Sequence, residues 1–146
     1  AGDDKITFGT LTASKTITVK GGAGGDEFVV TNAKTDADAS KYVVISDASS
    51  DDKIKFGSVS GIQKIADSVV RDKTTLKEAI NAVLSTHDEA GKVYYFTYGN
   101  DTYVVHNAAT SSNALTTDDH LVKLAGVRAD DIIATYDTTQ GTFNIN

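Results

Sequence analysis

The chain has 146 residues, enough for one domain, or two small ones, with a real hydrophobic core. It is 40% hydrophobic, has a formal net charge of -6 and lacks any apolar run near the roughly 20 residues of a membrane-spanning helix, so we expect a soluble globular protein without membrane insertion. Its 14 basic residues against 20 acidic ones argue against a nucleic-acid partner and favour cations.

The composition places carboxylates in turns. Asp supplies 17 of the 20 acidic residues, and Asp favours turns and helix caps over helix interiors. The chain contains no Cys, which suits a secreted bacterial protein, and no Met, so we expect a piece of a longer protein. Any chemistry is therefore expected from oxygen ligands in turns.

The first thirty residues contain an eleven-residue repeat. Short β-prone segments separated by polar turns occur at residues 6–8, 17–19 and 28–30. Two arrangements explain this spacing. The units are either coils of a parallel solenoid or strands of an antiparallel meander, in which such a spacing is common.

Two more strands and one helix follow. Residues 42–46 and 54–56 are predicted strands, with a polar turn between them. From about Thr75 to Ser85 the apolar residues take helical spacing, and Thr75 with Glu78 forms a capping-box pattern. We expect this amphipathic helix to pack its apolar face on a sheet.

The last third of the chain predicts a β-hairpin and further strands. Two β-branched and aromatic runs, 93–98 and 102–106, are joined by the turn residues 99–101. A polar loop is expected over 107–117. Later strands are expected at 120–124 and 132–135, with a last edge strand at 142–145. The predicted fold class is mainly β with one helix.

Four segments share a pattern in which a Gly or Ser turn and an Asp precede a large apolar residue that begins a strand. Their aspartates are Asp4, Asp26, Asp52 and Asp101. Residues 21–29, GGAGGDEFV, match every specified position of GGxGxDxUx, where U is a large apolar residue. This segment resembles the calcium-binding nonapeptide of the RTX family.

The resemblance implies a site in which the Gly-rich turn presents backbone carbonyls and the Asp carboxylate completes the coordination, while U points into a parallel β-roll. Calcium prefers six to eight oxygen ligands, and glycine permits the positive φ that such a turn needs. The implied cofactor is Ca²⁺, and the candidate ligands are Asp4, Gly22, Gly24, Asp26, Asp52 and Asp101. The alternative is a plain Gly-rich turn without an ion and, at Asp101, an ordinary hairpin turn.

The spacing departs from the family pattern. RTX repeats are tandem nonapeptides whose turns stack, whereas the four aspartates of this chain are 22, 26 and 49 residues apart. Only the unit at residues 21–29 is complete. We therefore expect degenerate RTX-like parallel β-roll or solenoid coils over residues 1–60.

A second resemblance covers residues 21 to about 127. The order of elements, including the phrases at 99–105 and 119–127, resembles the C-terminal module of bacterial surface proteins exported by type I secretion, such as S-layer proteins and large adhesins. It implies an export signal near the C-terminal end and folding outside the cell when calcium is available. Residues 61–146 would form this β-rich module with its one helix, or a single continuous domain with residues 1–60.

The resulting functional hypothesis is a structural surface-layer module at the bacterial cell surface. It would bind calcium, support secretion through the type I machinery and self-associate in a lattice. The alternative is a calcium-stabilised adhesin or carbohydrate-binding domain whose ligand surface consists of Tyr94, Tyr95, Tyr98 and Tyr103. Cross-strand packing explains the same tyrosines equally well.

We do not expect an enzyme. The histidines, His87, His106 and His120, lack the four-residue spacing of a helical zinc pair, and no Cys could complete a structural zinc site. A Gly-x-Ser-x-Gly nucleophile elbow is also missing from the sequence.

Overall fold

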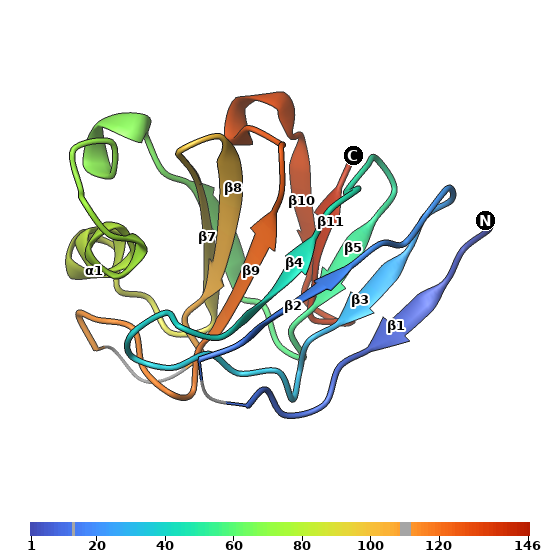
Figure 1. Cartoon of the computed structure of the whole chain (residues 1–146), viewed down its shortest axis with the longest axis horizontal. Helices are drawn as coiled ribbons and strands as arrows, with labels where there is room; N and C mark the ends of the chain where they lie inside the picture. Colours follow the sequence, from blue (N-terminus) through green and yellow to red (C-terminus); the bar gives the residue numbers. More distant parts are fainter. Residues whose placement is uncertain (13, 109–111) are drawn as a thin grey trace.

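The computed structural model describes residues 1–12, 14–108 and 112–146, which form two mixed β-sheets and one α-helix (Figure 1). The five-stranded sheet has the order β1-β3-β5-β11-β10, and the six-stranded sheet has the order β2-β4-β9-β8-β7-β6. The elements are β1 (Lys5–Thr7), β2 (Thr16–Val19), β3 (Glu27–Val29), β4 (Tyr42–Ile45), β5 (Lys53–Lys55), β6 (Gly61–Lys64), α1 (Leu76–Thr86), β7 (Lys92–Tyr98), β8 (Asp101–His106), β9 (His120–Leu124), β10 (Ala134–Asp137) and β11 (Thr142–Ile145). The mainly β class is thus confirmed.

From β1 to β5 the chain alternates between the two sheets. β1, β3 and β5 pair in parallel in one sheet, and β2 and β4 pair in parallel in the other. Ile6 lies opposite Phe28, and Phe28 lies opposite Ile54. Two eleven-residue repeats therefore bring the chain back to the same sheet. The antiparallel meander is wrong for this segment, because these strand pairs are parallel.

The β7–β9 part of the six-stranded sheet is buried on both faces. Tyr95, Val104 and Val122 pack in the core between the two sheets. Tyr94 and Phe96, which point to the other face, pack against the apolar face of α1, on the side away from the five-stranded sheet (Figure 1). The alternation follows from the two-residue period of a strand, and it confirms the expected packing of the helix.

The helix begins as the sequence predicts. Thr75 is its N-cap, and its hydroxyl oxygen accepts a hydrogen bond of 3.2 Å from the backbone N–H of Glu78. The Glu78 carboxylate accepts from the backbone N–H of Thr74 at 3.1 Å, so the reciprocal bond is displaced by one residue from the expected capping box.

Four expectations about the strands need correction. The hairpin turn has two central residues, because Tyr98 pairs with Asp101. β6 was not predicted. β10 covers Ala134–Asp137 and not 132–135, and a 3-10 turn at Ala129–Asp131 precedes it. β11 is an inner strand between β5 and β10, not an edge strand. Of the predicted loop at 107–117, residues 109–111 lie outside the described residues.

Residues from both sides of position 60 build the same sheets and the core between them. β5 pairs with β11, and β4 pairs with β9. Phe28 and Phe143 belong to the same hydrophobic cluster. Within the described ranges, the helical segments are all too short or too polar to span a bilayer.

Candidate metal site in the stacked Asp turns

The turns that precede β1, β3 and β5 are stacked at one end of the five-stranded sheet. The backbone N–H of Asp4 donates to Oδ1 of Asp26 at 2.9 Å, and the backbone N–H of Asp26 donates to Oδ1 of Asp52 at 2.8 Å. Because the three strands are parallel and in register, the residues just before them are aligned. We call Asp4, Asp26 and Asp52 the Asp ladder; the sequence predicted all three as ligands.

The inner members of the Asp ladder are withdrawn from solvent. Asp26 is 0% exposed and Asp52 is 2% exposed, whereas the Asp4 side chain is 52% exposed. Oδ2 of Asp52 accepts a bond of 2.8 Å from the backbone N–H of Ser49. Oδ2 of Asp26 is buried and has no hydrogen-bond partner among the described residues. A buried carboxylate oxygen without a donor is costly, so this atom is suited to a cation.

The Gly-rich turn is shaped by close contacts with its neighbours. Gly22 and Gly24 have φ values of +99° and +125°, which disfavour any residue with a side chain. A Cβ on Gly24 would lie 2.4 Å from the carbonyl oxygen of Gly2, in the preceding turn. A Cβ on Gly21 would lie 2.0 Å from Oδ2 of Asp26. Glycine is therefore required for the turns to stack.

A hollow of about 780 Å³ lies beside the Asp ladder. Gly22 and Gly24 line it, as do three carboxylates that were not among the predicted ligands: Asp3, Asp47 and Asp51. Oδ1 of Asp3 accepts from the N–H of Gly25 at 3.0 Å. The two carboxylate oxygens of Asp47 accept from the N–H groups of Gly21 and Gly22, each at 3.0 Å.

The sequence held a signal for two of these additional aspartates. Residues 3–6 and 51–54 both read Asp-Asp-Lys-Ile, and the structure places the second Asp of each phrase in the Asp ladder and the first at the hollow. Aligning the two phrases would have identified Asp3 and Asp51 together with Asp4 and Asp52.

Asp101 lies in the six-stranded sheet and is not part of the Asp ladder. Its Oδ1 accepts from the N–H of Gly126 at 2.7 Å, and its Oδ2 lies 3.1 Å from Nζ of Lys123. The two carboxylate oxygens therefore tie the β7–β8 hairpin to β9 and to the turn that follows it. The hairpin interpretation accounts for Asp101 without an ion.

The donors in the stacked turns fit a hard cation in their chemistry. They are carboxylate and backbone oxygens, which calcium prefers, and no sulfur or imidazole ligand is among the candidates. In the described ranges no three His, Cys, Asp or Glu side chains converge as a metal-binding group. Backbone carbonyls of the Gly-rich turn would have to supply much of the coordination, together with Asp26.

The four tyrosines considered as a ligand surface are packing residues. Tyr94, Tyr95 and Tyr103 are 0%, 8% and 6% exposed. The Tyr98 hydroxyl donates to the carbonyl oxygen of Lys73 at 2.8 Å, which ties the hairpin to the segment before α1. The cross-strand packing interpretation is confirmed, and the tyrosine surface is wrong.

Fold and site together define a mainly β protein with stacked aspartate turns. A scan against protein-family models finds no match, and a search of curated proteins finds no relative. The function is therefore inferred from the geometry of the turns.

Proposed function

We propose that this chain is a calcium-binding structural module of a secreted bacterial surface protein of the S-layer type. The observation that carries the proposal is Asp26, which is fully buried in the Asp ladder and leaves Oδ2 without a hydrogen-bond partner among the described residues. A bound calcium ion would compensate this buried oxygen, and the Gly-rich turn would supply further ligands.

The arrangement of β1 to β5 supports the proposal that this region is a short parallel β-roll. Consecutive strands lie in opposite sheets, and parallel pairing joins strands that are two apart in the chain. The members of the Asp ladder are separated by 22 and 26 residues, so one coil of two strands lies between each pair. A separation that looks too long for stacked RTX-like turns is thus the length of one coil.

Calcium binding would be coupled to folding of these coils. Asp3, Asp26, Asp47 and Asp51 gather negative charge at one end of short strands, and Lys53 at the same hollow offsets only part of it. The remaining repulsion opposes pairing when no cation is bound. A ligand that binds only the folded state stabilises it by about 2.7 kcal/mol at a concentration 100 times its Kd. Low calcium inside the cell would keep the coils open for secretion, and calcium outside would close them.

The open edge strands of the two sheets support self-association in a lattice. Among the described residues the five-stranded sheet ends at β1 and the six-stranded sheet ends at β2, so both present unpaired strand edges. Ile17 of β2 is 43% exposed. We propose that these edges contact another copy of the module, because exposed edges are ready templates for strand pairing. The alternative function, a calcium-stabilised adhesin or carbohydrate-binding domain, lacks comparable support because three of its four tyrosines are buried.

Thermal unfolding followed by circular dichroism tests calcium binding. We expect saturating calcium to raise the Tm of the wild-type chain by roughly 5–10 °C over its value in EDTA, while magnesium has little effect. Asp26→Asn should abolish the response, because it removes the buried charge and keeps the shape of the side chain. Asp72→Asn is the matched control, since that side chain is 72% exposed and lies near Lys73.

Equal melting of the wild-type chain in EDTA and in calcium would overturn the calcium site. Light scattering and electron microscopy of the same samples test the lattice separately. Calcium-dependent growth of ordered assemblies is the expected result. A calcium-stabilised chain that stays monomeric at all concentrations would reject self-association and leave the calcium site standing.

A further inference from the structure

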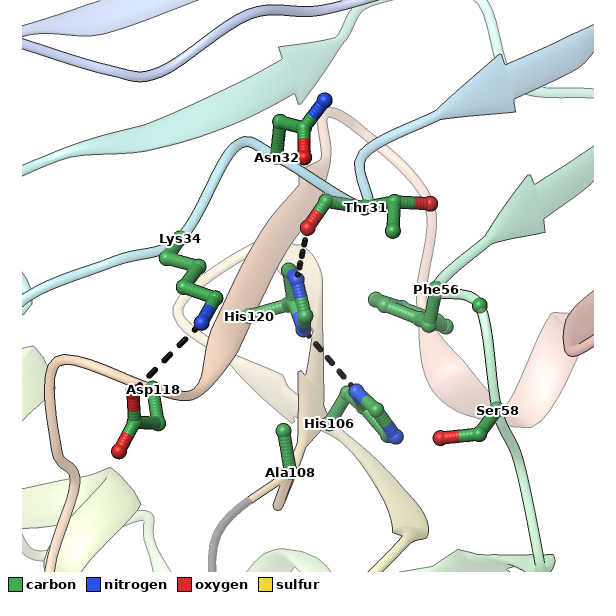
Figure 2. A pocket seen from close by; sticks show the side chains of 10 residues that line it. Thr31, Asn32, Lys34, Phe56, Ser58, His106, Ala108, Asp118 and His120 are labelled. Atoms are coloured by element: carbon green, nitrogen blue, oxygen red, sulfur yellow. Dashed lines mark hydrogen bonds and ion pairs between the residues drawn. The ribbon is translucent and has the colours of Figure 1, made fainter.

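Two buried histidines meet where β8 ends and β9 begins. His106 and His120 lie directly opposite each other in the antiparallel pair, and they are 1% and 3% exposed. Their Nδ1 atoms are 3.0 Å apart, with the rings stacked side by side (Figure 2). Because the two residues are paired on neighbouring inner strands, the short distance follows from the register of β8 with β9.

The surroundings fix where the ring protons lie. Nε2 of His120 is 3.0 Å from the carbonyl oxygen of Thr31, which can only accept a hydrogen bond. Nε2 of His120 therefore carries the proton, and its Nδ1 is unprotonated and can accept. In a neutral pair, His106 must then donate from its own Nδ1. That assignment leaves Nε2 of His106 unprotonated, and this atom is buried without a hydrogen-bond partner among the described residues.

Both rings are neutral at physiological pH. Burial, together with the neighbouring His120, lowers the pKa of His106 to about 4. Burial also lowers the pKa of His120; Lys34 lowers it further, while the Thr31 backbone and Asp119 oppose the shift. Neutral imidazole is the form that binds metal ions.

We propose that His106 and His120 bind a first-row transition-metal ion, such as Zn²⁺ or Cu²⁺, between their Nδ1 atoms. Tetrahedral zinc with bonds to nitrogen of about 2.0–2.1 Å places two ligand nitrogens roughly 3.3–3.4 Å apart. The two nitrogens would therefore need to separate by a few tenths of an ångström, and the rings would need to tilt so that both lone pairs point at the ion. Nitrogen ligands also favour such metals over calcium, so this site is chemically distinct from the Asp turns.

The groups next to the Nε2 atoms of the two rings support this assignment. The Thr31 carbonyl holds His120 through Nε2–H, which is the outer contact that metal-bound histidines usually make. A metal ion would replace the proton between the rings, and the His106 proton would move to Nε2. There it faces the Ser58 backbone, which favours a protonated His106 ring. The proton stays on the ring, so binding at neutral pH releases none.

A hollow with a mixed polar and apolar lining lies next to the pair and gives room for the remaining ligands. It has a volume of about 560 Å³, and Asn32, Ser58 and the Lys34–Asp118 ion pair, with a distance of 3.5 Å, lie along it (Figure 2). The described residues bring no third His, Cys, Asp or Glu side chain to the pair. Water molecules would fill the open positions, and we expect weaker binding than at a closed four-ligand structural site.

Titration of the whole chain with Cu²⁺ or Zn²⁺ in the presence of calcium tests the proposal. Isothermal titration calorimetry should give one ion per chain, with no proton release when buffers of different ionisation enthalpy are compared. His106→Gln and His120→Gln should each weaken binding at least tenfold. His87→Gln is the matched control, because His87 follows α1 and its Nδ1 contacts the Thr86 hydroxyl at 2.8 Å.

Nuclear magnetic resonance of the wild-type chain provides a readout that does not depend on the folding of a variant. One equivalent of Zn²⁺ should shift the ring signals of His106 and His120 and leave those of His87 in place. Absence of binding, shifts confined to His87, or unchanged affinity in the folded His106→Gln and His120→Gln chains would each overturn the proposal.

Discussion

The two ends of this molecule are stabilised by different physical means. At the end with the Asp ladder, strands of three or four residues are joined through carboxylate oxygens, and β1 is largely exposed. In the β7–β9 region the strands have five to seven residues, and apolar side chains cover both faces. The comparison teaches that the proposed cation would matter to one region, whereas the other is stabilised mainly by burial of apolar side chains.

The largest effect is expected from Phe96→Ala in the apolar region. Phe96 is 0% exposed, and its ring stacks on Tyr103 with centroids 6.2 Å apart. Truncation should lower the free energy of unfolding by about 3–5 kcal/mol because it removes apolar contacts and leaves a cavity. Urea denaturation should give the same loss in EDTA and in calcium. A loss that appears only in EDTA would break the comparison.

An intermediate effect is expected on acidification, through the histidine pair. The folded pKa of His106 is lowered to about 4, and that of His120 is also lowered, both first of all by burial. Their stabilisation is therefore complete above the unfolded pKa of about 6.5 and is lost as the pH falls below it.

Between pH 6.5 and 5 the free energy of unfolding should fall with a slope approaching about 1.4 kcal/mol per pH unit from His106, and His120 should make the slope steeper. Urea denaturation at a series of pH values in EDTA measures this slope. In the folded double variant His106→Gln and His120→Gln, the free energy of unfolding should depend much less on pH over the same range. An equal slope in the double variant would show that other groups cause the acid sensitivity.

A smaller and more local effect is expected from Gly24→Ala in the Gly-rich turn. The positive φ of Gly24 and the 2.4 Å approach to the Gly2 carbonyl should destabilise the stacked turns by about 1–3 kcal/mol. The calcium-induced rise in Tm should shrink. Gly99→Ala is the matched control, because Gly99 also has a positive φ, +67°, but open space around its Cβ position. Equal losses of the calcium response in the two variants would reject the packing argument.

Local sequence patterns predict most elements of the fold because strand and helix periodicity are local properties. The helix with its Thr75 cap and the strand His120–Leu124 lie where they were expected. β6 was missed because Gly61–Lys64 contains a single apolar side chain and pairs only with β7. The inner position of β11 depends on its pairing with β5, far away in the sequence, which no local pattern reveals.

The candidate site shows the same limit. The sequence identified Asp4, Asp26 and Asp52 from their turns, but the spacing of 22 and 26 residues gave no indication that they stack, because the intervening strands lie in the other sheet. Asp101 shares the turn pattern yet pairs with Lys123 in the six-stranded sheet. The histidine pair depends on the register of β8 with β9, which the three isolated histidines do not predict.

Hydrogen exchange measured by mass spectrometry in EDTA and in calcium tests most directly whether a cation stabilises one end of the molecule. Calcium should slow exchange in the turns and strands of residues 2–55, while β7 to β9 remain equally protected in both conditions. Uniform slowing across the chain, or no change in residues 2–55, would contradict the account.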